Sequence, residues 1–367
     1  MKLAFVTEPL TRFGGAERVL KVLHEMYPEA PVYTPYANDE VVARFFPAAD
    51  IRTSFLHRFP WRALPNRALL PLLPIAIESF DLRDYDTVVS SSSAFAKGVV
   101  TRSHARHVAY IHAPPRFLWE DRHLYLRSLS WSLFLSPALA PLLHWLRTWD
   151  QYSAHRVDAF VANSRYTALR VKKYWGKESQ VLYPPVDTQS YAGRDNPFSQ
   201  QPYALLVSRL TPHKRVELAL EAFHRLPALS LVVAGEGPQE KWLKAQAPPN
   251  AVFLAWQDRE KLRTLMAHAE CFLMPQVEDF GIAAVEAMAE GTPVLAFRGG
   301  GALETVKEGE AGEFFDDHDA FSLADGIRRI REGVRQGRYQ KEFLQQHAQQ
   351  FSEERFRAKI QDIVNAK

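Results

Sequence analysis

The sequence contains only one cysteine, Cys271, so no disulfide can form within the chain. Without a disulfide framework, a cytoplasmic location is expected. The apolar part of the N-terminal stretch MKLAFVTEPL is too short for a signal peptide. Net charge is also small, since 45 basic and 42 acidic residues leave only +3, and we expect no nucleic-acid partner.

The sequence also lacks tandem repeats and low-complexity linkers, and 47% of its residues are hydrophobic, which indicates a globular chain. A length of 367 residues exceeds one typical core, so two domains are expected. We place them at 1–187 and 200–350, followed by a final helix over 351–367. Strand-like runs alternate with helical periodicity, which predicts two doubly wound α/β domains. The expected strands lie near residues 3, 32, 88, 108, 159, 181, 204, 231, 252, 271 and 294.

The strongest site signal lies between Met274 and Val306, where Glu278 and Glu286 flank a Phe280-Gly281 turn. The residues before the turn predict a strand, and residues 282–290 predict a helix. Ligands bind at such corners of parallel sheets, where the N–H groups at a helix N-terminus can bind a phosphate. Carboxylates accept hydrogen bonds from sugar hydroxyls. We therefore expect a ligand that carries both phosphate and hydroxyl groups.

A second corner carries two basic residues, Arg209 and Lys214. They follow a strand predicted for Tyr203–Val207, and Ser208 lies between that strand and Arg209. A helix is predicted to begin near Val216. A guanidinium and an ammonium at one strand-to-helix corner are suited to binding a diphosphate.

Three strand ends in the first half complete the pattern. Gly14 and Gly15 follow the first strand and open a helix, and glycines there let a ligand approach the backbone. His112 follows a strand and precedes two prolines, and Asn163 follows the next strand.

Taken together, and in their order along the chain, these motifs resemble those of glycosyltransferase family 4, whose members are retaining GT-B enzymes. The family pattern E-x7-E is matched from Glu278 to Glu286, and the pattern R-x4-K by Arg209 and Lys214. The strings EDFGI, GGG and HAPPRFLW look most like the bacterial mannosyltransferase-like branch that builds surface polysaccharides.

The resemblance implies two Rossmann-like domains that face each other across a cleft, with the C-terminal helix crossing back to the first. It implies transfer of a sugar, mannose from GDP-mannose, to a polyprenyl-diphosphate-linked or oligosaccharide acceptor. No cofactor and no metal are expected. Catalytic roles are implied for His112, Arg209, Lys214 and Glu278, with Glu286 on the ribose. The remaining donor-binding positions implied are Gly14, Gly15, Asn163, Ser208, Gly235, Phe280, Gly281 and Ile282.

Two segments of the first half suggest contact with a membrane. Residues 52–75 mix four arginines with aromatic and leucine residues, and no charged residue occurs over 128–146. The latter length could span a bilayer, but Pro137 and Pro141 would break a helix in lipid. We therefore expect a membrane-surface or lipid-acceptor patch on the inner face of the cytoplasmic membrane. An ordinary buried helical hairpin is the alternative.

Two other functions fit the same motifs. A nucleotide-sugar epimerase or hydrolase on a similar scaffold would turn over the donor without an acceptor. A non-catalytic, membrane-associated scaffold would bind no nucleotide.

Overall fold

The computed structural model describes residues 2–60, 66–122, 132–189, 198 and 201–366, and it describes only the backbone of 66, 67 and 132–138. The chain divides into two compact units. Unit 1 comprises Met1–Pro185 and Phe356–Lys367, and unit 2 comprises Val186–Arg355. Each unit is a parallel α/β domain built around its own sheet.

The sheet of unit 1 has seven parallel strands in the order β3-β2-β1-β4-β5-β6-β7. They are β1 (Leu3–Thr7), β2 (Val32–Thr34), β3 (Ile51–Thr53), β4 (Thr87–Ser92), β5 (Arg106–Ile111), β6 (Ala159–Ala162) and β7 (Gln180–Val181). The sequence order reverses between β1 and β4, which is the topological switch point of this sheet. Strand β3, which the sequence pattern does not predict, is a three-residue edge strand with two exposed residues.

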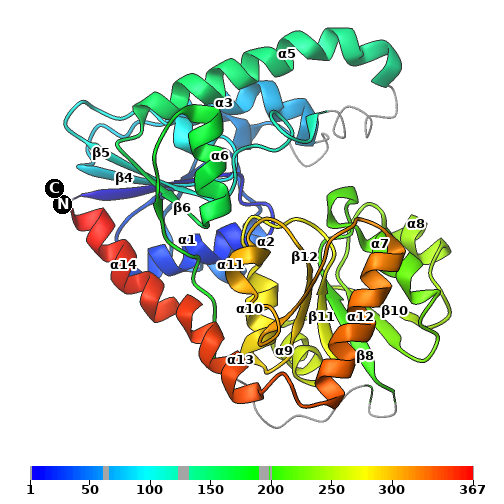
Figure 1. Cartoon of the computed structure of the whole chain (residues 1–367). Coiled ribbons are helices and arrows are strands. Elements are labelled where there is room, and N and C mark those ends of the chain that lie inside the picture. Colours follow the sequence, from blue (N-terminus) through cyan, green and yellow to red (C-terminus); the bar gives the residue numbers. More distant parts are fainter. Residues whose placement is uncertain (1, 61–65, 123–131, 190–197, 199–200, 367) are drawn as a thin grey trace. The chain divides into compact units, whose positions relative to one another are not determined.

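Helices cover both faces of this sheet. They are α1 (Gly15–Met26), α2 (Asp39–Phe45), α3 (Leu73–Glu78), α5 (Ser132–Ser153), α6 (Arg165–Trp175) and α14 (Glu353–Asn365). Helices α1 and α14 lie on one face, and α3 and α5 lie on the other (Figure 1). The final helix belongs to unit 1 because Phe356, Ile360 and Ile363 enter its core. Arg106 from β5 donates to the carbonyl oxygen of Ile363 at 2.7 Å.

The long uncharged stretch of unit 1 forms one helix, α5, which continues through Pro137 and Pro141. The expectation that these prolines break the helix is therefore wrong, because a helix can accommodate proline by losing a hydrogen bond. Leu143 and Leu146 of α5 are buried in the core, whereas 43% of the Trp145 side chain is exposed. None of the helices in the described ranges combines the length and the apolar content needed to cross a membrane.

The sheet of unit 2 has six parallel strands in the order β10-β9-β8-β11-β12-β13. They are β8 (Tyr203–Val207), β9 (Ser230–Ala234), β10 (Ala251–Leu254), β11 (Cys271–Met274), β12 (Val294–Phe297) and β13 (Gly312–Phe315). The order reverses between β8 and β11, so the segments that follow these two strands meet at the switch point.

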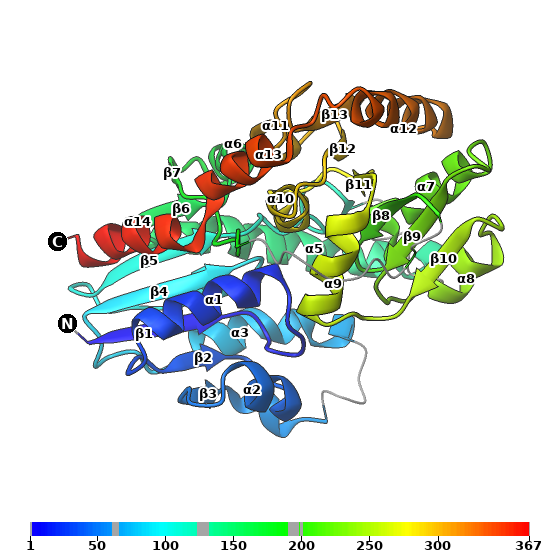
Figure 2. The same cartoon turned by 90° about the horizontal axis from the view of Figure 1, so that it is seen from below.

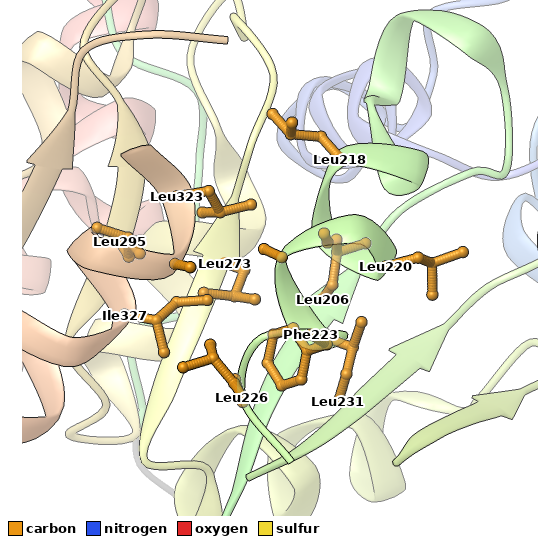
Figure 3. Close-up of a cluster of buried hydrophobic side chains, with 14 of the residues drawn as sticks. Leu206, Leu218, Leu220, Phe223, Leu226, Leu231, Leu273, Leu295, Leu323 and Ile327 are labelled. Atoms are coloured by element: carbon orange, nitrogen blue, oxygen red, sulfur yellow. The ribbon is translucent and has the colours of Figure 1, made fainter. Parts of the chain in front are cut away.

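The main helices of unit 2 are α7 (Val216–Phe223), α8 (Glu240–Ala245), α9 (Arg259–His268), α10 (Ile282–Ala289), α11 (Ala302–Thr305), α12 (Ala320–Arg335) and α13 (Lys341–Ala348). Helices α7 and α12 pack together on one face of the sheet, and α9 and α10 pack on the other (Figure 2). Leucines from β8, β9, β11 and β12 interlock with Phe223 of α7 and Ile327 of α12 (Figure 3). This dry core fixes the strand ends that carry the predicted site.

Candidate active site

The predicted donor-binding residues of unit 2 gather at its switch point. Arg209 is an exposed residue two positions after β8, and Lys214 ends a short 3-10 helix over Pro212–Lys214. Glu278 and Gly281 follow β11, the neighbour of β8 in the sheet. The topology therefore brings together two motifs that lie about sixty residues apart in the sequence, from Lys214 to Glu278.

Lys214 and Glu278 are in direct contact. The Lys214 ammonium donates to Oε1 of Glu278, and the two side chains are only 19% and 21% exposed. The amide Nε2 of Gln276 donates to the same carboxylate oxygen at 2.6 Å. The motifs do not predict this pairing, in which a residue assigned to the diphosphate neutralises another assigned to the sugar.

Close backbone contacts shape the loops around this pair. A Cβ atom at Gly235, which follows β9 with φ +143°, would lie 2.0 Å from the carbonyl oxygen of Ser208. A Cβ atom at Gly300 would lie 2.3 Å from the carbonyl oxygen of Glu278, which also accepts from the Gly301 N–H at 2.8 Å. Glycine at 235 and 300 thus lets neighbouring loops pack against the segments that carry Ser208 and Glu278.

Helix α10 begins beside Glu278. Gly281, whose backbone is left-handed, is its N-cap and Gly291 follows its end, as the sequence predicts. Glu286 lies in the second turn and is only 4% exposed, while Ile282 is partly exposed. Phe280 is 3% exposed and its ring packs edge-on against Phe351, with centroids 5.5 Å apart. The Phe280 side chain is thus part of the packing that holds the start of α10.

The switch point of unit 1 binds a carboxylate of its own chain. Oε1 of Glu8, which follows β1, accepts from the backbone N–H groups of Ser93, Ala94, Phe95 and Ala96 at 2.8–3.1 Å. Successive N–H groups that converge in this way form an anion-binding nest. The Gly14 N–H likewise donates to Glu17 at 2.8 Å. These five backbone amides of unit 1 are therefore satisfied by acids of the same chain.

His112 lies at the end of β5, as predicted. Its Nε2 atom is 2.8 Å from the Ser91 hydroxyl at the end of β4, and its carbonyl oxygen accepts from Asn163 at 2.9 Å. The structure thus brings together two of the predicted residues of unit 1. Burial lowers the pKa of His112 to about 3. The ring is therefore neutral near pH 7 and retains one donor and one acceptor nitrogen.

A buried ion pair anchors the C-terminal half of α5 to the same edge of the sheet. Lys97 and Asp150 are 0% and 1% exposed, and Nζ lies 2.8 Å from Oδ1. Oδ2 of Asp150 accepts from the indole N–H groups of Trp119 and Trp175, both at 2.8 Å. Burial lowers the pKa of Lys97, and the charge of Asp150 opposes that shift. Sequence reasoning missed this network because its members are far apart along the chain.

The predicted site residues therefore fall into one group in each unit. Gly14, Gly15, His112 and Asn163 belong to unit 1, and the others belong to unit 2. Among the described residues, no cluster of three or more His, Cys, Asp or Glu side chains is arranged to hold a metal ion. Three acidic residues, Asp316, Asp317 and Asp319, follow β13. Asp319 caps a helix, because it accepts from the N–H groups of Phe321 and Ser322 at the start of α12.

Comparison with solved structures identifies the class of fold. HepE of Anabaena in complex with UDP and glucose is 18% identical, and the match covers all of both chains with a TM-score of 0.75. Sucrose-phosphate synthase from Thermosynechococcus elongatus is also 18% identical, with 98% of each chain covered and a TM-score of 0.76. Two doubly wound parallel sheets of this kind define the GT-B fold.

Sequence comparison identifies the family. The profile described as Glycosyltransferase Family 4 matches residues 13–190, and the one described as Glycosyl transferases group 1 matches residues 189–343. The chain belongs to glycosyltransferase family 4. A GDP-mannose-dependent alpha-(1-6)-phosphatidylinositol monomannoside mannosyltransferase of Mycolicibacterium smegmatis is 32% identical over 199 residues, 46% of this chain and 52% of that protein. The matches span about a third to a half of the length of such curated relatives.

Proposed function

We propose that the protein is a retaining glycosyltransferase that moves a hexose from a nucleoside diphosphate sugar to a hydroxyl acceptor. The observation that carries this proposal is the contact between Lys214 and Glu278 at the switch point of unit 2. A cation for the diphosphate and an acid for the sugar hydroxyls are held at adjacent strand ends, where parallel α/β sheets bind ligands.

The proposed reaction breaks the bond between the anomeric carbon and the diphosphate oxygen. Negative charge develops on the leaving diphosphate, where Arg209, Lys214 and the N-terminus of α10 stabilise it. The acceptor oxygen bonds to the anomeric carbon on the face that the leaving group vacates, which retains the configuration. The departing diphosphate takes the acceptor proton. Glu278 binds donor hydroxyls and Glu286 binds the ribose.

Substitution of Arg209 and Lys214 tests whether these residues bind the diphosphate. Arg209→Ala and Lys214→Ala should each cost about 2–4 kcal/mol in transition-state stabilisation, the range for losing one preorganised donor. Steady-state kcat/KM measures the effect, and circular dichroism checks the fold. Wild-type kcat/KM in both variants would overturn the proposed role of this corner.

For the donor we propose GDP-mannose, as in the name of the mycobacterial relative. The HepE crystals contain UDP and glucose, which makes UDP-glucose the natural competitor. A thermal-shift screen with GDP, UDP and ADP distinguishes the bases. The largest shift with UDP would reject GDP-mannose, and no shift with any nucleotide would reject the glycosyltransferase proposal.

For the acceptor we propose a polyprenyl-diphosphate-linked saccharide, which a cytoplasmic enzyme would reach at the membrane surface. The support is apolar exposure in unit 1, where Phe55, Phe59 and Trp145 are 39%, 48% and 43% exposed and Arg58 is an exposed cation. Arg52 does not contribute, because it binds Asp50 and two tyrosine hydroxyls. Trp61 and Arg62 lie outside the described residues.

Liposome co-sedimentation tests the membrane proposal. Wild type should sediment with anionic vesicles at low salt, because each cation near an anionic leaflet contributes about 1 kcal/mol that salt screens. The double variant Arg58→Glu/Phe59→Ser should stay in the supernatant. Lys172→Glu reverses an exposed charge in α6 of the same unit and serves as the control. Wild type that remains soluble with anionic vesicles would favour a soluble oligosaccharide acceptor.

A further inference from the structure

Gln276 is a buried polar residue beside the predicted sugar site. It lies two residues after β11 and is only 6% exposed. Its Nε2 atom donates to Glu278 at 2.6 Å. Among the described residues, nothing forms a hydrogen bond with its Oε1 atom.

Chemistry fixes which amide atom faces which way. An ionised carboxylate only accepts hydrogen bonds, so the nitrogen of Gln276 must face Glu278 and the oxygen must face elsewhere. A buried acceptor without a donor is unfavourable, and native proteins retain few of them. A hydroxyl group of a bound ligand would supply the missing donor.

We propose that Gln276 is a specificity-determining residue that reads a hydroxyl of the donor sugar. Glu278 accepts from one hydroxyl, and Oε1 of Gln276 accepts from its neighbour on the same pyranose ring. The ligand class is therefore a hexose with two adjacent free hydroxyls at this corner. This inference rests on the proposed glycosyltransferase function and adds to it a residue to which the family motif assigns no role.

The same amide has a positioning role through its nitrogen. In the structure Lys214 and Gln276 share one oxygen of Glu278. When a diphosphate draws Lys214 away, the Gln276 N–H remains to orient the carboxylate toward the sugar. One side chain thus orients Glu278 and completes the pair of acceptors that recognises the diol.

The experiment compares kcat/KM for the donor that the enzyme uses with kcat/KM for each of its monodeoxy analogues. Wild type should discriminate against loss of one hydroxyl by about tenfold through the Gln276 contact, as expected for one hydrogen bond. Gln276→Met keeps the length of the side chain and removes both polar atoms, so discrimination at that hydroxyl should fall to within about twofold. Gln276→Glu keeps acceptor oxygens but loses the N–H that holds Glu278. Its kcat should therefore fall, while its discrimination at that hydroxyl should be retained.

Controls separate the possible failures. Gln246→Met makes the same chemical change at an exposed position of unit 2 and should leave the discrimination pattern unchanged. Equal loss of hydroxyl discrimination in Gln276→Met and Gln276→Glu would indicate a merely structural role and overturn the inference. Unchanged discrimination in Gln276→Met would also overturn it, although the transferase proposal would stand. A wild type that binds no nucleoside diphosphate and transfers no sugar would overturn both.

Discussion

The substitution Glu278→Gln should strengthen binding of the free nucleoside diphosphate while it slows sugar transfer. In the structure the Glu278 carboxylate contacts the Lys214 ammonium, which the proposed mechanism assigns to the diphosphate. A diphosphate must therefore compete with Glu278 for Lys214. The neutral amide has the same shape but holds Lys214 less strongly, so part of that competition disappears.

The contact sets the size of the gain. Exposed ion pairs contribute about 0.2–1 kcal/mol, and this pair is about four-fifths buried, so we take about 1 kcal/mol. That energy corresponds to roughly fivefold tighter binding of the diphosphate. Turnover should nevertheless fall by about 10²–10³, the usual effect of removing one preorganised electrostatic group at the reacting centre.

Calorimetric titration with the nucleoside diphosphate and steady-state kinetics measure the two effects separately. Glu286→Gln should give the opposite sign and weaken diphosphate binding, because Glu286 is assigned to the ribose. Glu270→Gln breaks a partly exposed pair with Arg331 at the other end of β11 and should change neither quantity. Equal losses of affinity in Glu278→Gln and Glu286→Gln would refute the assignment of the two acids.

Three further outcomes follow from the structure. Asp150→Asn and Lys97→Met should each destabilise unit 1 by about 3–5 kcal/mol, because each change leaves one buried charge unpaired. The double variant should lose less stability than the sum of the two single losses. Urea unfolding followed by tryptophan fluorescence measures these losses, and additive losses would contradict the coupling. Sugar transfer should continue in excess EDTA, because side chains and backbone amides are proposed to stabilise the negative charge on the leaving diphosphate. A loss of activity that Mn²⁺ or Mg²⁺ restores would show that a metal ion is required. Burial lowers the pKa of His107 to about 4, below its value near 6.5 in the unfolded chain. Protonation of His107 therefore favours unfolding. This residue should lower the free energy of unfolding by about 3 kcal/mol as the pH drops from 6.5 to 4. His107→Gln should flatten that slope in urea titrations, and an unchanged slope would assign the acid sensitivity to other groups.

The strand-to-helix corners could be predicted because each is a local pattern. The apolar run over Cys271–Met274 and the helical spacing after Gly281 predict β11 and α10 within a residue. The sequence pattern does not predict two of the strands, β3 and β13. Strand β3 is short and exposed at the sheet edge, and β13 contains Glu313 between a glycine and two phenylalanines. Neither offers a run or an alternation of apolar residues that stands out from a loop.

The pairings within the site could not be predicted in the same way. Lys214 and Glu278 meet because β8 and β11 are neighbours at the switch point, and a single sequence does not specify strand order. The same holds for the nest around Glu8, which depends on β1 lying beside β4. Gln276 carries no motif, and only the geometry reveals that its oxygen lacks a partner.

The division of the chain into units has a consequence for its biosynthesis. Unit 2 is one continuous insertion into unit 1, and its two ends lie side by side because Val186 pairs with Ser352. The first unit needs Phe356, Ile360 and Ile363 to complete its core. At typical synthesis rates of about 5–20 residues per second, the ribosome therefore makes all of unit 2 for roughly 10–30 s while the first core stays open. During that interval an apolar face of unit 1 is uncovered, so the unit that begins folding first is the last to finish.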